Sequence, residues 1–462
     1  MNIFIAGICG TFMAGIAQIA KTANHRVSGC DANVYPPMST LLVDKGIDVK
    51  QGYDPGHIEK DIDQIIIGNA LSRGNMLVEE VLDQGLDYQS GPAWLHNHIL
   101  MKRQVIAVAG THGKTTTSSM IAWILDYNDK KPGFLIGGKP GNFDSSARTG
   151  EGQHFVIEAD EYDTAFFDKR SKFVHYSPNI AVLNNLEFDH ADIFSDLGQI
   201  KTQFHHLVRI IPGNGHIVIN ADDENLAEVI AMGHWSHLHG VSTGDINAEW
   251  FARPITDDHS QFEVYQWGEK IHEVNWNLMG SHNMQNALAA IAAASLCGIT
   301  VKSSAQALET FITTDRRLQL LYSSTSTHLY EDFAHHPTAI KYTLETLRQK
   351  YPHHLLIAVM EPRSNTMQSG CHNHTLGPAL DSADIALIYQ PTEQEWNTAH
   401  LSSKAELVSC QSKEQLLETI NLRLTTNSVI ICMSNGGFDG IPASLMKQFQ
   451  TRRNSPDNSL SS

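Results

Sequence analysis

The sequence has few cysteines, and none of them is paired in a metal-binding or redox spacing. Six cysteines occur in 462 residues, without a C-x-x-C pair. A chain of this length can bury its own cores without disulfides, so this cysteine usage predicts a reduced, cytoplasmic environment. The length also exceeds what one core usually organises, and it predicts two to three domains.

A basic surplus and long apolar runs are also missing. The formal net charge is −17, which argues against nucleic acid or an anionic membrane as the main partner, because both require a basic face. No stretch approaches about 18 uninterrupted apolar residues. No basic leader precedes the apolar residues 3–6. We therefore expect neither a membrane-spanning helix nor export.

The dinucleotide-binding fingerprint is incomplete. Residues 2–8 are an apolar run, and a helix is expected from there through Lys21, as in the first unit of a nucleotide-binding α/β fold. The fingerprint needs glycines where Cys9 and Phe12 stand, which weakens the prediction of a nicotinamide cofactor. Asp31, at the end of the second predicted strand, could still hold a ribose hydroxyl.

What the sequence does contain is a phosphate-loop pattern. The apolar residues 105–109 run into Gly110-Thr111-His112-Gly113-Lys114-Thr115-Thr116, where a helix is expected to start. Backbone N–H groups of such a turn attract nucleotide phosphates, Lys114 can neutralise them, and Thr115 can ligate Mg²⁺. Val108 stands where the strict pattern has its first glycine, so the loop is a shortened variant. The alternative is an ordinary glycine turn.

Polar residues follow two later strands of the same predicted sheet. Glu158 ends the strand that begins at residue 155, and Asn184 ends the strand that begins at residue 180, with Asn185 directly after it. The ligand of an open parallel sheet lies at the carboxyl ends of its strands, so these side chains should surround whatever the phosphate loop holds. Glu158 suits Mg²⁺, whereas His190 is a less usual ligand for this ion. Alternatively, residues 158–163 form a solvated acidic loop and His190 caps a helix.

The rest of the chain predicts further α/β layers. Strand 65–67 leads into a turn that ends at Ser72, residues 245–275 are rich in strands, and an alanine-rich helix follows Gly280. More strands are expected at 328–332, 355–360, 385–389 and 428–432. We therefore predict domains at 1–103, 104–313 and 314–451, and a disordered tail at 452–462.

Together these residues resemble the ATP-dependent Mur ligases, which build the peptide of bacterial cell-wall precursors. The resemblance extends over nearly the whole chain, and it rests on the motifs 110–116, Glu158, Asn185 with Asp189-His190, Gly280 with His282-Asn283 and Asn286, Arg316-Arg317, and Asp332-Phe333 with His335-His336-Pro337. It implies three α/β domains: a Rossmann-like UDP-binding domain, a central P-loop ATPase-type domain with a parallel sheet, and a C-terminal Rossmann-like domain.

The resemblance also implies roles in an ATP and Mg²⁺ site. The expected catalytic residues are Lys114, Glu158, His190 and His112, and the expected metal ligands are Thr115, Glu158 and His190. ATP would contact Gly110, Thr111, Gly113, Lys114, Thr115, Thr116, Asn283, Asn286, Arg317 and Asp332. Simpler interpretations remain: the two asparagines could cap a helix, Arg317 could pair with Asp315, and Asp332 could be a turn residue.

A second set of residues resembles the UDP-sugar site of the muramate-binding branch of this family. Its loop residues are Gly7, Cys9, Gly10, Thr11, Phe12 and Met13, and Asp31 and Ser72 are assigned to the same site. His112 and Asn185 would face the acceptor substrate. Several Mur ligases carry a carbamylated lysine fifteen residues after the metal histidine, but His205 stands at that position here, so no carbamylation is expected.

Three stretches distinguish between branches of the family. Residues 158–170, 184–194 and 361–367 resemble the branch that joins UDP-N-acetylmuramate to the murein tripeptide L-alanyl-γ-D-glutamyl-meso-diaminopimelate in peptidoglycan recycling. Arg363 would pair with a carboxylate of the diaminopimelate, or alternatively it only follows a strand and faces solvent. The alternative within the family is the UDP-N-acetylmuramate:L-alanine ligase. A folylpolyglutamate synthetase, a nicotinamide oxidoreductase and a non-catalytic nucleotide sensor are more distant candidates. We expect a monomer or weak dimer.

Overall fold

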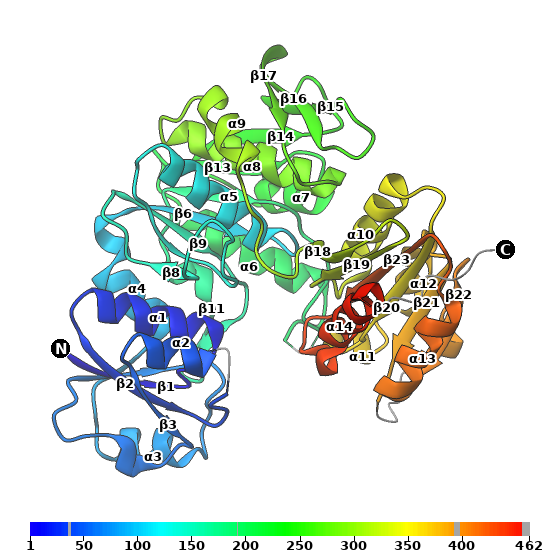
Figure 1. Ribbon diagram of the computed structural model, residues 1–462. Coiled ribbons are helices and arrows are strands. Elements are labelled where there is room, and N and C mark those ends of the chain that lie inside the picture. The colour runs from blue at the N-terminus through cyan, green and yellow to red at the C-terminus, as the bar shows by residue number, and fades with distance from the viewer. Residues whose placement is uncertain (36–37, 192, 392–397, 455–462) are drawn as a thin grey trace.

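The structure is a computed structural model that describes residues 1–35, 38–191, 193–391 and 398–454. Its strands form three large sheets that follow one another along the chain (Figure 1). Each sheet is built mainly from parallel strands with helices between them. The prediction of three α/β domains is confirmed. The boundaries expected at 103/104 and 313/314 fall in the connections between successive sheets, before β6 and before β18.

The first sheet has five parallel strands in the order β3-β2-β1-β4-β5. Buried isoleucines of β1 and β4 form its centre, as expected for strands that are covered on both faces. The elements are β1 (Asn2–Ala6), α1 (Thr11–Thr22), β2 (Arg26–Asp31), α2 (Met38–Asp44), β3 (Asp48–Gln51), η1 (Pro55–His57), β4 (Gln64–Ile67), α3 (Met76–Asp83), β5 (Tyr88–Ser90), α4 (Gly91–His98) and η2 (Leu100–Lys102).

The central sheet has ten strands in the order β17-β16-β15-β14-β13-β12-β6-β9-β7-β8, and only β8, β16 and β17 run antiparallel to their neighbours. Its strands are β6 (Gln104–Ala109), β7 (Gly133–Leu135), β8 (Ala147–Arg148), β9 (His154–Glu158), β12 (Ile180–Leu183), β13 (His216–Asn220), β14 (His237–Ser242), β15 (Trp250–Pro254), β16 (Gln261–Gln266) and β17 (Glu269–Asn275). A separate hairpin pairs β10 (Asp163–Ala165) with β11 (Asp168–Ser171).

Helices cover the central sheet and complete its core. The alanine-rich α8 packs on α5, and their small side chains allow close approach of the two helices. The helical elements are α5 (Lys114–Tyr127), η3 (Lys172–His175), α6 (Leu197–Arg209), α7 (Glu224–Ala231), α8 (Ser281–Leu296) and α9 (Val301–Glu309).

The third sheet has six strands in the order β18-β19-β23-β20-β21-β22, of which β18 alone is antiparallel to its neighbour. The elements are β18 (Gln319–Ser323), β19 (Thr327–Asp332), α10 (Pro337–Lys350), β20 (Leu355–Met360), α11 (Asn365–Gln368), α12 (Asn373–Ala379), β21 (Ile385–Tyr389), η4 (Thr398–His400), β22 (Glu406–Cys410), α13 (Lys413–Arg423), β23 (Ser428–Met433), η5 (Phe438–Gly440) and α14 (Ile441–Asn454).

The C-terminal end differs from the sequence prediction. Helix α14 continues through Asn454, so regular structure extends three residues into the segment 452–462 that we expected to be disordered. The remaining residues of that segment, 455–462, lie outside the described part of the chain.

The first domain packs directly on the central sheet. Helix α1 contacts β7 and β8, and a side chain added at Gly15 would lie 2.4 Å from Leu135 Cδ1. One apolar cluster contains buried residues of both domains, whereas the two clusters of the third domain contain residues of that domain alone. In Figure 1 the third domain accordingly lies apart from the first, with the central domain joining them. None of the helices in the described ranges has the length and apolar character that crossing a bilayer requires.

Candidate nucleotide and substrate site

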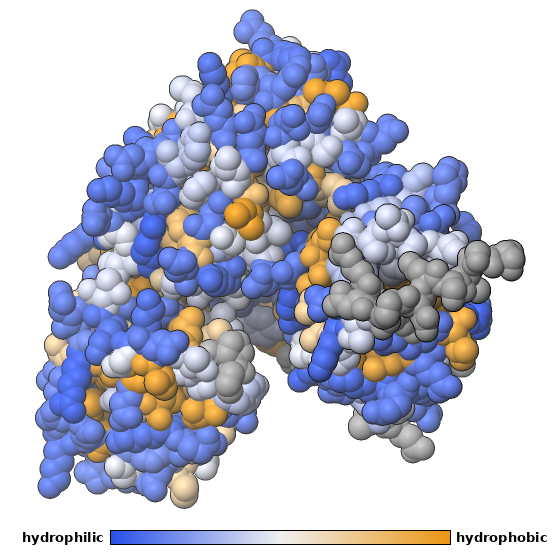
Figure 2. Space-filling model, viewed as in Figure 1, coloured by the Kyte–Doolittle hydropathy of each residue, from blue (hydrophilic) through white to orange (hydrophobic). Residues whose placement is uncertain are grey.

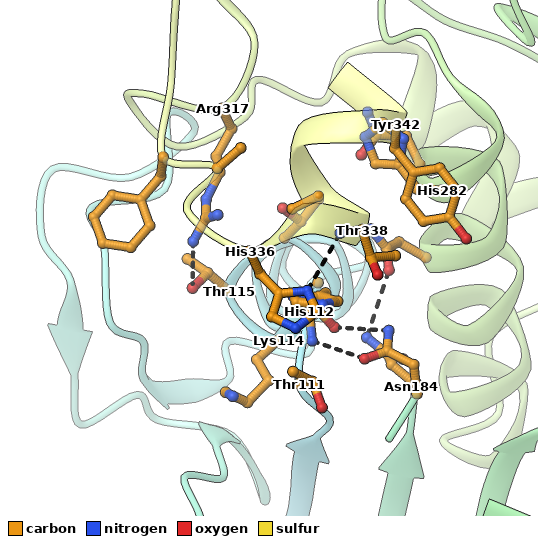
Figure 3. Close-up of a pocket in the computed structure, with 18 of the residues that line it drawn as sticks. Thr111, His112, Lys114, Thr115, Asn184, His282, Arg317, His336, Thr338 and Tyr342 are labelled. Atoms are coloured by element: carbon orange, nitrogen blue, oxygen red, sulfur yellow. Dashed lines mark hydrogen bonds between the residues drawn. The ribbon is translucent and has the colours of Figure 1, made fainter. Parts of the chain in front are cut away.

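The phosphate loop connects β6 to α5 and is shaped by contacts with α8 (Figure 3). Gly113 is the N-cap residue of α5 and has a φ of 79°, in the left-handed region that favours glycine. A Cβ at this position would lie 2.4 Å from Oδ1 of Asn286. Gly113 therefore allows Asn286 of α8 to lie directly against the loop.

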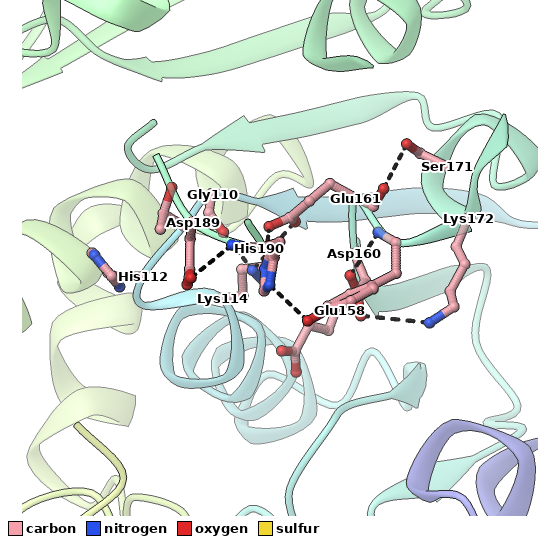
Figure 4. A network of polar contacts seen from close by, with 12 residues as sticks. Gly110, His112, Lys114, Glu158, Asp160, Glu161, Ser171, Lys172, Asp189 and His190 are labelled. Carbon is pink, nitrogen blue, oxygen red and sulfur yellow. Dashed lines mark hydrogen bonds and ion pairs between the residues drawn. The ribbon is translucent and has the colours of Figure 1, made fainter. Parts of the chain in front are cut away.

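Lys114 is held by the loop and by the acidic segment that follows β9 (Figure 4). Its ammonium donates to the Gly110 carbonyl at 2.6 Å and lies 3.4 Å from Glu161 Oε2. Burial alone would lower the pKa of Lys114, but the carboxylates of Glu161, Asp160 and Glu158 outweigh it and the pKa is raised. Lys114 is therefore a fixed positive charge at the start of α5.

Thr115 and Glu158 form the oxygen-rich pair predicted for Mg²⁺. The Thr115 hydroxyl lies 3.0 Å from both carboxylate oxygens of Glu158, which also accepts a hydrogen bond from the Gly137 N–H at 2.8 Å. A hydroxyl and a carboxylate at this separation suit a hard cation that also binds phosphates. From the third domain, Arg317 Nη2 donates to the Thr115 hydroxyl at 3.3 Å.

His190 lies in the loop after β12, and its ring contacts the acidic segment that follows β9. Its Nε2 lies 2.9 Å from Glu161 Oε1, and its Nδ1 lies 2.6 Å from the Tyr162 hydroxyl. Burial disfavours the imidazolium, but Glu161 and Asp189 outweigh burial, so the pKa of His190 is raised. Both ring nitrogens have protein partners, so a metal-ligand role requires His190 to exchange one of them.

A cavity of about 350 Å³ lies between the phosphate loop and the third domain, and Figure 3 shows the side chains that line it. It contains all four remaining residues of the predicted ATP site: Asn283, Asn286, Arg317 and Asp332. Arg317 stacks on Phe333, with the guanidinium carbon 4.9 Å from the ring centroid. The structure thus brings these sequence-predicted residues together around one space.

The simpler interpretations find little support for Asn283 and Arg317, but one of them fits Asp332. The N-cap residue of α8 is Gly280, not an asparagine, and the Asn283 amide donates to the Met279 carbonyl at 2.8 Å. The hydrogen bond of Arg317 goes to Thr115. The Asp332 carboxylate does accept the N–H groups of Leu318 and Ala334, so it organises this turn as well as lining the cavity.

His112 and Asn185 are joined to each other at the mouth of the loop. Asn185 Oδ1 accepts the His112 N–H at 2.7 Å, and the Asn185 amide donates to the His112 carbonyl at 3.1 Å. His112 Nε2 and His336 Nδ1 each lie 3.4 Å from Glu187 Oε2. These three ligand atoms lie within 4.8 Å of one another and could hold a metal ion. Imidazole nitrogens would favour a transition metal over Mg²⁺.

A second, larger cavity of about 1310 Å³ is bordered by all three domains. Figure 2 shows the hollow between the first and third domains on the viewed face. Its lining includes most of the predicted substrate residues, namely Gly7, Cys9, Gly10, Thr11, Phe12, Met13, Asp31 and Arg363. Asn185 lines the smaller cavity instead. Ser72 is exposed and lies outside the residues that line this cavity, so its assignment lacks support from the geometry.

Asp31 shapes the glycine loop of the first domain. One carboxylate oxygen accepts the Cys9 N–H at 2.9 Å and the other accepts the Asn33 N–H at 3.0 Å. Burial, together with the Asp31 charge, raises the pKa of the Cys9 thiol to about 11. Cys9 is therefore a neutral packing residue at the loop rather than a reactive thiol.

Sequence reasoning missed three charged residues of the site. Glu161 is 3% exposed and pairs with both Lys114 and His190. Glu187 connects His112 to His336, and Lys172 is a buried lysine on the wall of the larger cavity. The acidic run 158–163 was the available signal for Glu161, but nothing in the sequence distinguishes its buried members from exposed ones.

Comparisons with known proteins agree with this architecture. Three family models match consecutive parts of the chain: Mur ligase family, catalytic domain, at residues 2–103; Mur ligase middle domain at 108–294; and Mur ligase, glutamate ligase domain, at 316–436. The chain is 51% identical, over 96% of its length and 98% of the relative, to the UDP-N-acetylmuramate--L-alanyl-gamma-D-glutamyl-meso-2,6-diaminoheptandioate ligase of Escherichia coli K12.

Two further matches show the range of similarity. The crystal structure of a murein peptide ligase from Psychrobacter arcticus 273-4 is 43% identical, with a TM-score of 0.76 that covers 97% of this chain and 98% of that chain. The UDP-N-acetylmuramate--L-alanine ligase of Clostridium perfringens is 29% identical over 94% of this chain and 95% of its own length.

The fold and the site define a nucleotide-dependent ligase of three α/β domains. The chain belongs to the Mur ligase family. Mur ligases are ATP-dependent, so the phosphate loop described above has the expected cosubstrate.

Proposed function

We propose that this ATP-dependent Mur ligase joins UDP-N-acetylmuramate to the tripeptide L-alanyl-γ-D-glutamyl-meso-diaminopimelate, with Mg²⁺ as the metal. The observation that carries the proposal is that the two cavities meet: Glu158, Asp189, His190 and His335 line both of them. One cavity contains the phosphate loop and the other contains the glycine loop of the first domain. A nucleotide in the first and a sugar nucleotide in the second would meet at these residues.

The reaction divides into two displacements. A carboxylate oxygen of the muramate attacks the γ-phosphorus of ATP, and the bond between this phosphorus and the oxygen of the β-phosphate breaks. ADP departs, and the muramate carries an acyl phosphate. The free amine of the tripeptide then attacks the acyl carbon, phosphate leaves with the bonding pair, and the amine loses a proton as the amide forms. Positioning and charge neutralisation carry most of such a phosphoryl transfer.

The residues of the loop support the first displacement. Lys114 carries a fixed positive charge at the N-terminal end of α5, where phosphate oxygens are also attracted to the backbone N–H groups. Thr115 and Glu158 would hold Mg²⁺, which when bound neutralises charge on the phosphates. Arg317 and Asp332 approach from the third domain, so closure of that domain would exclude water from the acyl phosphate.

The larger cavity supports the choice of a tripeptide over alanine. It extends from the glycine loop of the first domain to Arg363 of the third domain, which gives room for a long acceptor. The relative at 51% identity bears a name that includes this tripeptide, whereas the L-alanine ligase of C. perfringens is 29% identical. The remaining site residues, the domain boundaries, a cytoplasmic location and a monomeric or weakly dimeric state stay predictions.

Phosphate release from ATP tests the proposal. The full chain is mixed with ATP, Mg²⁺ and UDP-N-acetylmuramate, and the tripeptide is compared with L-alanine as the amine. Turnover with the tripeptide, together with a product of the mass expected for the new amide, supports the proposal. Turnover with L-alanine alone would instead assign the alternative function within the family.

A further inference from the structure

Lys172 is a buried lysine whose ammonium makes a single, long ion pair among the described residues. It is the first residue of η3, directly after the β10–β11 hairpin, and it is 8% exposed. Its ion pair is with Asp160, at 3.6 Å from Nζ to Oδ2, which is longer than a normal hydrogen bond. An ammonium has three N–H donors, and the contact with Asp160 uses at most one of them.

Two aromatic rings hold this ammonium in place. Nζ lies 5.8 Å from the ring centroid of Phe12 and 5.5 Å from that of Tyr162. Ring faces attract a cation but provide no acceptor lone pair for its N–H groups. The rings therefore fix the position of the charge and leave its donors available to a ligand.

The ammonium faces the larger cavity, on the side of the first domain. Lys172, Asp160 and Tyr162 line the cavity together with the glycine loop and Phe12 (Figure 4 shows Lys172 and Asp160). Phe12 is the second residue of α1, a helix of 12 residues whose N-cap is Gly10 and has no side-chain cap. The first N–H groups of such a helix have no partner within the helix and favour anionic oxygens.

We infer that Lys172 binds the diphosphate of the sugar nucleotide, opposite the N-terminus of α1. The diphosphate would then lie between a helix end of the first domain and a lysine of the central domain. This inference rests on the proposed function and adds a substrate-binding residue to it. Asp160 is the acidic group that faces the same ammonium, so the ligand would have to share the charge of Lys172 with it.

Three probes distinguish whether Lys172 binds the diphosphate or the muramate carboxylate, which is the other anion of the substrate. UDP and UDP-N-acetylglucosamine carry the diphosphate but lack the muramate carboxylate. If Lys172 binds the diphosphate, replacing Lys172 weakens the binding of UDP, UDP-N-acetylglucosamine and UDP-N-acetylmuramate by the same factor. If it binds the carboxylate instead, only UDP-N-acetylmuramate weakens, and the inference is wrong.

Isothermal titration of the full chain with these three probes makes the test. Lys172→Met should weaken all three by about 10- to 100-fold, the range of one charge-assisted contact. Lys172→Arg should restore part of the loss. Lys169→Met is the matched control, because Lys169 lies three residues earlier, pairs with Asp163 and has a 71% exposed side chain. It should bind the probes like the unchanged protein.

The remaining outcomes are also informative. Unchanged binding of UDP by Lys172→Met would overturn the inference, provided that the unchanged protein binds UDP. Failure of the unchanged protein to bind any of the three probes would contradict the proposed function itself. A thermal melt of each variant shows whether it is folded. If Lys172→Met fails to fold, Lys172→Gln and the salt dependence of UDP binding replace it, and a loss confined to UDP-N-acetylmuramate again counts against the inference.

Discussion

The Thr338 hydroxyl donates a 2.6 Å hydrogen bond to Glu187 Oε2, and this contact joins the third domain to the central domain. Glu187 follows β12 of the central sheet, whereas Thr338 lies in the first turn of α10. The same carboxylate lies 3.4 Å from His112 Nε2 in the phosphate loop. Burial raises the pKa of Glu187, but the hydrogen bond with His112 outweighs burial and the pKa is lowered to about 2. Glu187 is therefore an ionised acceptor, and its hydrogen bond with Thr338 accompanies closure of the third domain on the central domain.

Removing the Thr338 hydroxyl should weaken closure without altering the loop. We expect Thr338→Val to raise the KM for ATP several-fold, because a hydrogen bond to a charged group is lost at the domain interface, at a cost of about 1–3 kcal/mol. Steady-state kinetics with varied ATP measures this. Thr375→Val removes an exposed hydroxyl of the same domain and should leave KM unchanged. Equal KM values for the two variants would contradict the role of Thr338.

Gly113→Ala should weaken ATP binding by filling the space of Asn286. The new Cβ would lie 2.4 Å from Asn286 Oδ1, in addition to the strain of a φ of 79°. Gly298 is a matched control, because it also has a φ of 79° but has nothing within 4 Å of a new Cβ. Both alanine variants should lose about 1 kcal/mol from backbone strain.

The difference in ATP affinity between the two glycine variants measures the effect of the clash with Asn286. Thermal melts measure the shared loss of stability, and titration with ATP and Mg²⁺ measures binding. We expect normal ATP affinity for Gly298→Ala and at least a tenfold loss for Gly113→Ala. Normal affinity for Gly113→Ala would mean that the Asn286 contact with the loop is dispensable.

His282 should make folding stability depend on pH. Burial, with the nearby charges of His259 and Arg317, lowers its pKa from 6.5 to about 4. A histidine with a lowered pKa in the folded state contributes stability that is complete above the unfolded pKa of 6.5. This stability is lost as pH falls toward 4, because the unfolded chain then binds the proton first.

Urea unfolding at pH 7.5 and pH 5 tests this sign. From pH 7.5 to pH 5, the free energy of unfolding of the unchanged protein should fall. The fall should be about 1–2 kcal/mol smaller in His282→Gln. His353→Gln, which changes an exposed histidine of the third domain, serves as the control. An identical fall in His282→Gln and the unchanged protein would show that His282 does not carry this pH dependence.

Arg363 should determine the affinity for the tripeptide. It lines the larger cavity, and its guanidinium packs on Gly436, where an added Cβ would lie 2.3 Å from Nη1. We expect Arg363→Ala to raise the KM for the tripeptide by about tenfold and leave the KM for ATP unchanged, because a carboxylate contact is lost. Arg363→Lys should restore little, since lysine cannot form the paired contact. A normal tripeptide KM in Arg363→Ala would remove Arg363 from the acceptor site.

Local sequence patterns predicted the parts of the site that lie within one strand and the loop after it. The segment from Val105 to Thr116 specifies a strand, a turn and a helix, and Glu158 is the last residue of β9, which pairs with β6. Both therefore reach the same edge of the sheet by the rules of parallel sheets. The fold class follows from the same alternation of strands and helices.

Local sequence patterns could not predict contacts between distant segments of the chain. Glu187 and Thr338 are 151 residues apart, and Lys172 and Phe12 lie in different domains. Their pairing depends on how separately folded layers pack, which no local period encodes. Strands β18 and β22 were not predicted either, because they are edge strands of the third sheet with few fully buried residues.

Transfer of labelled oxygen tests the central claim that the muramate carboxylate is activated by ATP. UDP-N-acetylmuramate labelled with ¹⁸O in its carboxylate is turned over with ATP, Mg²⁺ and the tripeptide, and the released phosphate is analysed by mass spectrometry. An acyl phosphate predicts one labelled oxygen in each phosphate, with the other label kept in the amide. Unlabelled phosphate during amide formation would contradict the account, because the carboxylate oxygen would then never have been bonded to phosphorus.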